Sequence, residues 1–152
     1  MASGPGHYDA HGNPCLKLHL CGVAHTPPGL EFEGIIDTGF TGFIQLPIAH
    51  AFSLKLPLEG TASYTLADGS QSTCLTALAT TSFSGKAING VVTLAMGSQD
   101  ILIGMDFLRQ LKLGLLIVTG QIFLIDEEEA AAIAKSQGEE KDGGAEPDGV
   151  SG

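Results

Sequence analysis

The segment "FEGIIDTGFTGFIQLP" (residues 32–47) places a single carboxylate between two apolar runs. The first run predicts a buried strand, and this run stops at Asp37. Thr38 adds a hydroxyl group, and Gly39 removes a side chain, so that backbone N–H groups can approach the carboxylate closely. A second strand is predicted over residues 41–47. Taken alone, the Asp-Thr-Gly triplet also fits a simple Asx-type turn between two strands.

The flanking sequence predicts a mostly β domain. Period-two alternation or short apolar runs predict further strands at residues 16–22, 30–36, 90–96 and 100–104. Two alternating arms around the turn Ala67-Asp68-Gly69-Ser70 predict a β-hairpin over residues 61–83. A closing hairpin is predicted over residues 115–125, with its turn at Thr119-Gly120.

Two segments favour helical structure. Residues 48–55 are predicted to form a short helix or a turn. Residues 105–114 place Phe107, Leu108 and Leu111 on one helical face, with Gly114 as the expected C-cap. The sequence therefore predicts one defined helix within a domain of strands.

The charge distribution separates a nearly neutral domain from an acidic tail. Residues 126–152 carry nine acidic and two basic residues, whereas the rest of the chain carries eight and five. We expect residues 1–14, which are rich in Gly, His and Pro, to be disordered, and residues 15–126 to form the folded domain. Residues 127–152 are expected to begin with one or two frayed helical turns and to continue as a flexible tail.

Composition argues against several classes of partner and location. There is no basic stripe for a nucleic-acid backbone and no apolar run of membrane-spanning length, so neither nucleic acid nor a membrane is expected as a partner. The first residues have no cationic start and no apolar core of a secretory signal. Cys15, Cys21 and Cys74 do not form a disulfide pattern, which favours a cytoplasmic protein.

No metal site and no cofactor are predicted. His7 and His11 are four residues apart, but they fall in the segment expected to be disordered. His19, Cys21 and His25 follow one another along a strand and its exit, and no shared metal ion is expected there.

The order of these motifs resembles the retropepsin-like aspartic proteases. "IIDTG", "FIQLP", the hairpin with an Asp-Gly tip and "ILIGMDFL" follow one another over residues 16–125 as in that family. Single-domain bacterial and DNA-damage-inducible-type members look closer than viral ones. The resemblance implies a single-lobe, closed β-barrel-like fold with a flap hairpin and one short C-terminal helix. Two positions depart from the family pattern: Phe40 replaces the usual Ala or Ser after the triplet, and Met105-Asp106 replace an Arg of viral members.

The resemblance implies a catalytic triplet Asp37-Thr38-Gly39 and a homodimer. Aspartic protease chemistry needs two carboxylates around one water molecule, and the pair shares a proton. The chain contains a single Asp-Thr-Gly, and its folded part is too short for two protease lobes. The second carboxylate is therefore expected from Asp37 of another copy, which a two-fold axis brings to face the first. Thr38 would link the two loops across this axis.

The expected substrate is a peptide or protein that is cut between apolar residues. The hairpin near residues 61–75 would cover an extended peptide as a flap, although an ordinary surface hairpin is the alternative. The residues expected to contact substrate belong to the flap or to apolar walls of the cleft, namely Phe40, Tyr64, Leu66, Ala67, Asp68, Gly69, Ile101 and Ile103.

Two other functions are compatible with parts of the pattern. A catalytically silent dimerisation or peptide-binding module can use the same fold, although such a module has no chemical need for Asp37. Residues 37–41 also match the Asp-x-Gly-x-Thr turn of actin-like and sugar-kinase ATPases, but those folds need far longer chains with two lobes. An active endopeptidase is the interpretation that uses the intact triplet.

Overall fold

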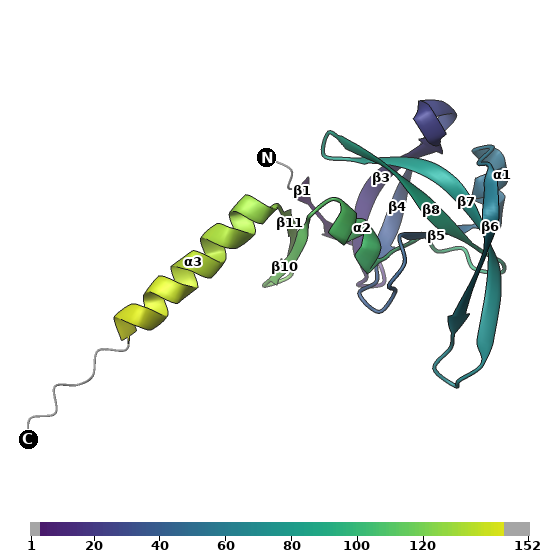
Figure 1. Cartoon of the computed structure of the whole chain (residues 1–152). Coiled ribbons are helices and arrows are strands. Elements are labelled where there is room, and N and C mark those ends of the chain that lie inside the picture. Colours follow the sequence, from purple (N-terminus) through teal and green to yellow (C-terminus); the bar gives the residue numbers. More distant parts are fainter. Residues whose placement is uncertain (1–3, 145–152) are drawn as a thin grey trace, which may run out of the picture.

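A strongly curved β-sheet forms the body of the molecule, and a hairpin and a long helix project from it (Figure 1). The figure shows the computed structural model, which describes residues 4–144 of the chain, with side chains for residues 6–138. No helix within the described residues is long and apolar enough to cross a membrane. The prediction of a mostly β domain is confirmed.

The elements follow the order predicted from the sequence. The strands are β1 (Gly4–Pro5), β2 (His7–Tyr8), β3 (Pro14–Gly22), β4 (Thr26–Ile36), β5 (Ile44–Pro47), β6 (Leu58–Thr65), β7 (Gln71–Phe83), β8 (Lys86–Ala95), β9 (Leu102–Ile103), β10 (Gly114–Val118) and β11 (Gln121–Ile125). The helices are the 3₁₀ turn η1 (Val23–His25), α1 (Ile48–Ser53), α2 (Met105–Gln110) and α3 (Glu127–Gly144). Both predicted hairpins are present, as β6–β7 and as β10–β11.

The main sheet closes on itself. Eight strands lie in the order β2-β3-β4-β9-β5-β8-β7-β6, and an additional antiparallel pairing joins β3 to β7. In that pairing His19 lies opposite Ser82 and Cys21 lies opposite Thr80. Closure leaves few unpaired strand edges in the body. The single-lobe, barrel-like fold expected from the sequence is therefore confirmed, while β1, β11 and β10 form a separate three-stranded sheet.

Apolar side chains from both the sheet and α2 fill the interior. On β3, Leu16, Leu18 and Leu20 point inward and are almost completely buried, while the residues between them are exposed. Phe107 of α2 has no exposed surface, and its ring lies 5.8 Å from that of Phe43. Burial of each such side chain contributes about 1.5–3 kcal/mol, so the period-two pattern of β3 fixes which face is the core.

Helix α2 ends before the predicted cap. Its last residue is Gln110, and Lys112 takes the left-handed conformation with a φ of 54°. The N–H of Lys112 donates a hydrogen bond to the carbonyl of Arg109 at 3.1 Å, which closes the turn. The prediction of Gly114 as the C-cap is wrong, because the chain has already turned and Gly114 begins β10.

Both terminal segments are more ordered than predicted. Within residues 1–14, expected to be disordered, β1 pairs with β11 and β2 pairs with β3. The carboxylate of Asp9 accepts hydrogen bonds from the N–H groups of His11 and Asn13 and so closes the turn after β2. At the other end, α3 spans 18 residues in place of one or two frayed turns. Residues 1–3 and 145–152 lie outside the described residues, and the predictions for them stay predictions.

The short strand β9 holds the end of β4 in place. It lies between β4, to which it is parallel, and β5, to which it is antiparallel. The N–H of Asp37 donates to the carbonyl of Ile103, and the N–H of Gly104 donates to the carbonyl of Phe43, both at 2.9 Å. A Cβ on Gly104 would lie 2.0 Å from the carbonyl oxygen of Gly42. This contact is backbone against backbone, so only glycine fits at residue 104.

We predict that Gly104→Ala lowers the free energy of unfolding by about 2 kcal/mol or more, because the loop after β4 must move to admit the methyl group. Gly60→Ala is the control, since the nearest atom to a Cβ at that position is 3.9 Å away. Urea unfolding at one fixed protein concentration measures both. Equal stability of the two variants would contradict the proposed close contact.

Candidate active site

Asp37 occupies the first position after β4, at the start of a tight turn. Its side-chain oxygen Oδ1 accepts a hydrogen bond from the N–H of Gly39 at 2.9 Å, and its carbonyl accepts one from Phe40 at 3.1 Å. A Cβ on Gly39 would lie only 3.2 Å from Oδ1, so glycine permits the short N–H contact. Within residues 4–144, this N–H is the one hydrogen-bond partner of the Asp37 carboxylate. Its other oxygen, Oδ2, accepts no hydrogen bond from the part of the chain that the structure describes.

The loop that follows Asp37 is exposed at its tip and fixed at its base. Thr38 and Gly39 are exposed, whereas Asp37 and Phe40 are half-buried. The carbonyl of Phe40 accepts a hydrogen bond from the N–H of Met105 at 2.8 Å, which ties the loop to the first turn of α2. Thr38 and Gly39 are therefore on the surface, while hydrogen bonds to neighbouring elements fix the backbone around the Asp37 carboxylate.

A cleft of about 320 Å³ lies between this loop and the hairpin strand β6. Its lining combines the loop after Asp37 with four consecutive residues of β6 and two residues of the inner strands, namely Gly39, Phe40, Thr41, Gly42, Ala62, Ser63, Tyr64, Thr65, Gln45 and Thr93. The β6–β7 hairpin therefore faces the triplet across a space that an extended chain can enter.

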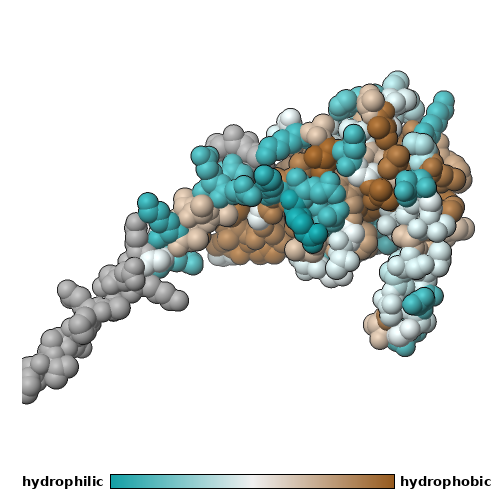
Figure 2. All heavy atoms as spheres, viewed as in Figure 1, coloured by the Kyte–Doolittle hydropathy of each residue, from teal (hydrophilic) through white to brown (hydrophobic). Residues whose placement is uncertain are grey.

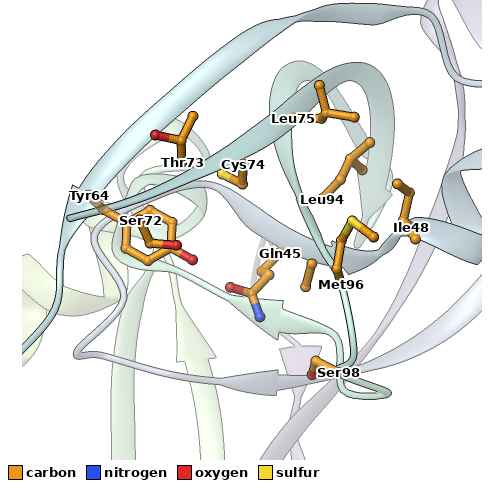
Figure 3. A pocket seen from close by; sticks show the side chains of 11 residues that line it. Gln45, Ile48, Tyr64, Ser72, Thr73, Cys74, Leu75, Leu94, Met96 and Ser98 are labelled. Atoms are coloured by element: carbon orange, nitrogen blue, oxygen red, sulfur yellow. The ribbon is translucent and has the colours of Figure 1, made fainter. Parts of the chain in front are cut away.

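A second cavity, of about 370 Å³, continues from the first. Gln45 and Tyr64 line both cavities. Figure 3 shows Tyr64 and Ser72 at one end of the second cavity, Met96 and Ile48 at the other, and the Gln45 amide between them. Its walls are mixed, with apolar side chains beside the hydroxyl and amide groups, so an occupant would need both apolar and polar groups.

The hairpin tip has its own local bonds. The N–H of Leu66 donates to the carbonyl of Ser70 at 2.7 Å, and Gly69 takes a φ of 85° at the turn. The Ser70 hydroxyl and, to a smaller extent, its N–H hydrogen-bond to the Asp68 carboxylate and hold the pKa of that carboxyl below its usual value. The tip projects away from the body and is mostly polar on the face seen in Figure 2.

The structure brings together some of the predicted site residues and separates others. Phe40 and Tyr64 line the cleft beside Asp37. The tip residues, Leu66 to Gly69, are exposed and do not line either cavity. Ile103 has no exposed surface and Ile101 is 6% exposed, so both belong to the core. Their prediction as apolar walls of the cleft is wrong, because both side chains are buried against Gly34 of the neighbouring strand β4.

Sequence reasoning missed Gln45, which lines both cavities, and Met96, which lines the second. Gln45 lies between the buried side chains Ile44 and Leu46 on β5 and points to the other face of the sheet. Met96 follows β8 and is 79% exposed at the rim. The alternation along β5 could have placed Gln45 on the cleft face, but no local signal marks Met96, whose position depends on the path of the loop after β8.

The structure thus combines an Asp-Thr-Gly turn at a strand end, a cleft beside it and a hairpin that faces the cleft, all within a single-lobe β fold. The family model of aspartyl proteases matches residues 26–107, which include the triplet, the hairpin and the start of α2. The chain belongs to the aspartyl protease family.

Solved structures with the same fold are retropepsin-like. A retropepsin-like aspartic protease from Rickettsia conorii superposes with a TM-score of 0.61 at 18% identity, over 80% of this chain and 89% of that one. The EIAV protease in complex with the inhibitor HBY-793 superposes with a TM-score of 0.55 at 19% identity, over 72% of this chain and 98% of that one. No curated protein sequence matches the chain. At these identities the structures support the fold and leave the chemistry to be argued from the site.

We predict that the hairpin tip stays closed at mildly acidic pH. Because the pKa of Asp68 is lowered in the fold, its bonds to Ser70 are complete above the ordinary pKa of an aspartate and are lost only as pH falls through the lowered value. An NMR titration of the Asp68 carboxyl carbon and the Ser70 amide measures this. Ser70→Ala should move the Asp68 pKa back toward its ordinary value, and an unchanged titration would contradict the assignment.

Proposed function

We propose that the chain acts as an aspartic endopeptidase in the form of a homodimer, with one Asp37 from each copy around a single water molecule. The observation that carries the proposal is the position of Asp37: the end of β4, one oxygen bound by the Gly39 N–H, beside a cleft that the β6–β7 hairpin faces. Membership of the aspartyl protease family supports the reaction class.

The two carboxylates would have different roles in each turnover. One is ionised and takes a proton from the water as the water oxygen attacks the peptide carbonyl carbon. The other is protonated and donates a hydrogen bond to the carbonyl oxygen, which stabilises the charge that develops there. Collapse of the tetrahedral intermediate breaks the C–N bond, and the leaving amine takes a proton from the pair.

The second carboxylate has no source within one chain. The triplet occurs once in the sequence. Three other aspartates of the described part have local partners: Asp9 is bonded by His11 and Asn13, Asp68 by Ser70, and Asp106 by Gln110. A two-fold axis near the exposed Thr38 would supply the missing group without any further sequence, because a residue at the axis meets its own copy.

The small sheet at the chain ends offers further surface for a second copy. Ile117, Val118 and Phe123 of the β10–β11 hairpin are 52%, 48% and 38% exposed. Strand β10 ends the sheet order β1-β11-β10, so one of its edges has no strand partner among the described residues. Exposed apolar side chains beside a strand edge are features that a partner surface commonly covers.

The cleft favours an extended peptide with apolar residues next to the cut bond. Phe40 and Tyr64 line the same cleft as Gly39 of the triplet, and Leu75, Leu94 and Met96 line the continuation of the cleft. The amide of Gln45 between them would bind backbone or side-chain polar groups of the substrate. Strand β6 is the last strand of the main sheet, and so its edge can add main-chain hydrogen bonds to an extended chain.

We predict that Asp37→Asn lowers kcat by about a thousandfold or more, because an amide can neither take the proton from water nor share one. Digestion of a peptide library across pH measures cleavage, with highest activity expected at mildly acidic pH, where the pair holds one proton. Circular dichroism checks that the variant is folded, and Asp100→Asn is the matched control at an exposed aspartate. A variant that cleaves like the wild type would end the proposal, and a folded dimer without any cleavage would favour the silent module.

We predict that Asp37→Asn also inhibits the wild type by forming mixed dimers. With both chains well above the dimer dissociation constant, an equal amount of the variant added to a fixed amount of wild type lowers activity to about half, since random pairing halves the wild-type dimer. Asp100→Asn added in the same way should roughly double the activity. Activity that is unchanged by Asp37→Asn, together with a monomer in sedimentation, would show that each chain works alone.

A further inference from the structure

Three potential metal ligands meet on one face of the sheet, and none of them lines the cleft beside Asp37. They are His7 of β2, Cys15 of β3 and Glu33 of β4. Their ligand atoms all lie within 4.8 Å of one another, and Nε2 of His7 is 2.9 Å from Oε1 of Glu33. The interpretation of His7 as part of a disordered segment without partners is therefore wrong, because β2 pairs with β3.

The backbone register, and not a chance contact of long side chains, brings the three groups together. His7 is directly opposite Cys15 in the β2–β3 pairing. Cys15 is opposite Ile35 in the β3–β4 pairing, so Glu33 is its diagonal neighbour. Opposite and diagonal residues of antiparallel strands point to the same face and lie within reach of each other. The cluster is thus built by three adjacent strands.

The chemistry of the three groups matches a zinc-class cation. Imidazole, thiolate and carboxylate bind such ions at about 2.0–2.3 Å, and tetrahedral coordination then separates the ligand atoms by about 3.5 Å. The His7–Glu33 distance of 2.9 Å would widen slightly on binding, and the other two distances are already no longer than 4.8 Å. Changes of this size need only side-chain rotation at the half-exposed His7 and the exposed Glu33.

The surroundings carry negative charge. Glu33 lines a cavity of about 470 Å³ together with Asp9, Glu31 and Asp100, and no Lys or Arg is part of that lining. Lys17 is opposite Glu33 in the strand register, but the carboxylate pairs with His7. A concentration of carboxylates at one edge raises the local concentration of cations.

We propose that His7, Cys15 and Glu33 bind one divalent cation of the zinc class, with water at the fourth position. Burial, with the nearby Asp9 and Glu33 charges, raises the pKa of Cys15 to about 12, so the thiol is protonated before the cation arrives. Binding forms the sulfur–metal bond, breaks the S–H bond and releases that proton to solvent. The bound ion would fasten β2 to β3 and β4.

The test uses the reduced full-length chain without a histidine tag, first stripped with a chelator. Zinc is titrated in competition with a chromophoric chelator, and cobalt(II) serves as the spectroscopic probe. We expect one ion per chain, a raised melting temperature, and a cobalt spectrum with a thiolate-to-metal charge-transfer band and intense tetrahedral bands. Hydrogen exchange of amides in residues 6–13 should slow when zinc is added.

Matched variants separate this site from adventitious binding. His7→Ala and Glu33→Gln should each weaken zinc binding about tenfold or more, and Cys15→Ser should remove the charge-transfer band. His11→Ala and Cys74→Ser remove a neighbouring imidazole and a more accessible thiol and should leave binding unchanged. Asp37→Asn should bind zinc like the wild type, so the result is independent of the proposed activity.

Two outcomes would overturn the proposal. One is the lack of zinc binding by the wild type at micromolar concentrations. The other is a failure of the variants to separate the site: zinc binds His7→Ala as tightly as the wild type, or His11→Ala weakens zinc binding as much as His7→Ala does. Since Cys15 is buried and Cys15→Ser can destabilise the fold, the surface variant His7→Ala decides the question when the serine variant does not fold.

Discussion

The hydrogen bonds between the loop after β4 and the β9–α2 segment are the constraint on which the site depends. Asp37, Phe40 and Phe43 each exchange a backbone hydrogen bond with residues 103–105. These bonds form only if the two stretches approach so closely that residue 104 has no side chain. The position of the carboxylate is therefore set by main-chain geometry. Side chains elsewhere can vary widely, which agrees with a shared fold at 18–19% identity.

The two sides of the cleft differ in how firmly they are attached to the body: the Asp37 loop is fixed, and the β6–β7 hairpin projects. The loop with Asp37 is bonded to β9 and α2, and the core under it is fully packed around Ile103 and Phe107. The β6–β7 hairpin, by contrast, extends from the body, and Tyr64, Leu66 and Leu75 on it are at least 40% exposed. An element with few buried contacts can move at low energetic cost, as a cover over a bound peptide must.

The sequence predicts most of the fold because the decisive signals are local. The alternation in β3 and the Asp-Gly turn of the β6–β7 hairpin each specify an element without reference to the rest of the chain. The failures at the N-terminus share one cause, which is dependence on distant partners. Strands β1 and β2 are two residues long and exist only through pairing with β11 and β3.

The candidate site shows the same division between local and distant information. The Asp-Thr-Gly triplet can be recognised from the sequence because its three residues are consecutive. Ile101 and Ile103 look like pocket walls until the topology places β9 between two strands and buries them. The cluster of His7, Cys15 and Glu33 is invisible in the sequence, since its spacing has meaning only once the strand register is known.

Under the proposed dimeric mechanism, activity depends on protein concentration, because dilution below the dimer dissociation constant would remove the second Asp37. Contacts that stabilise the proposed dimer would then affect activity as directly as residues that touch the substrate. Strand β1 pairs with β11, and β1 is separated from β2 by one residue. An ion that fastens β2 would therefore also help to hold the small β1-β11-β10 sheet against the body. Under the proposed mechanism, order at the chain ends would therefore support activity through the dimer, although the proposed catalytic residue Asp37 lies elsewhere in the fold.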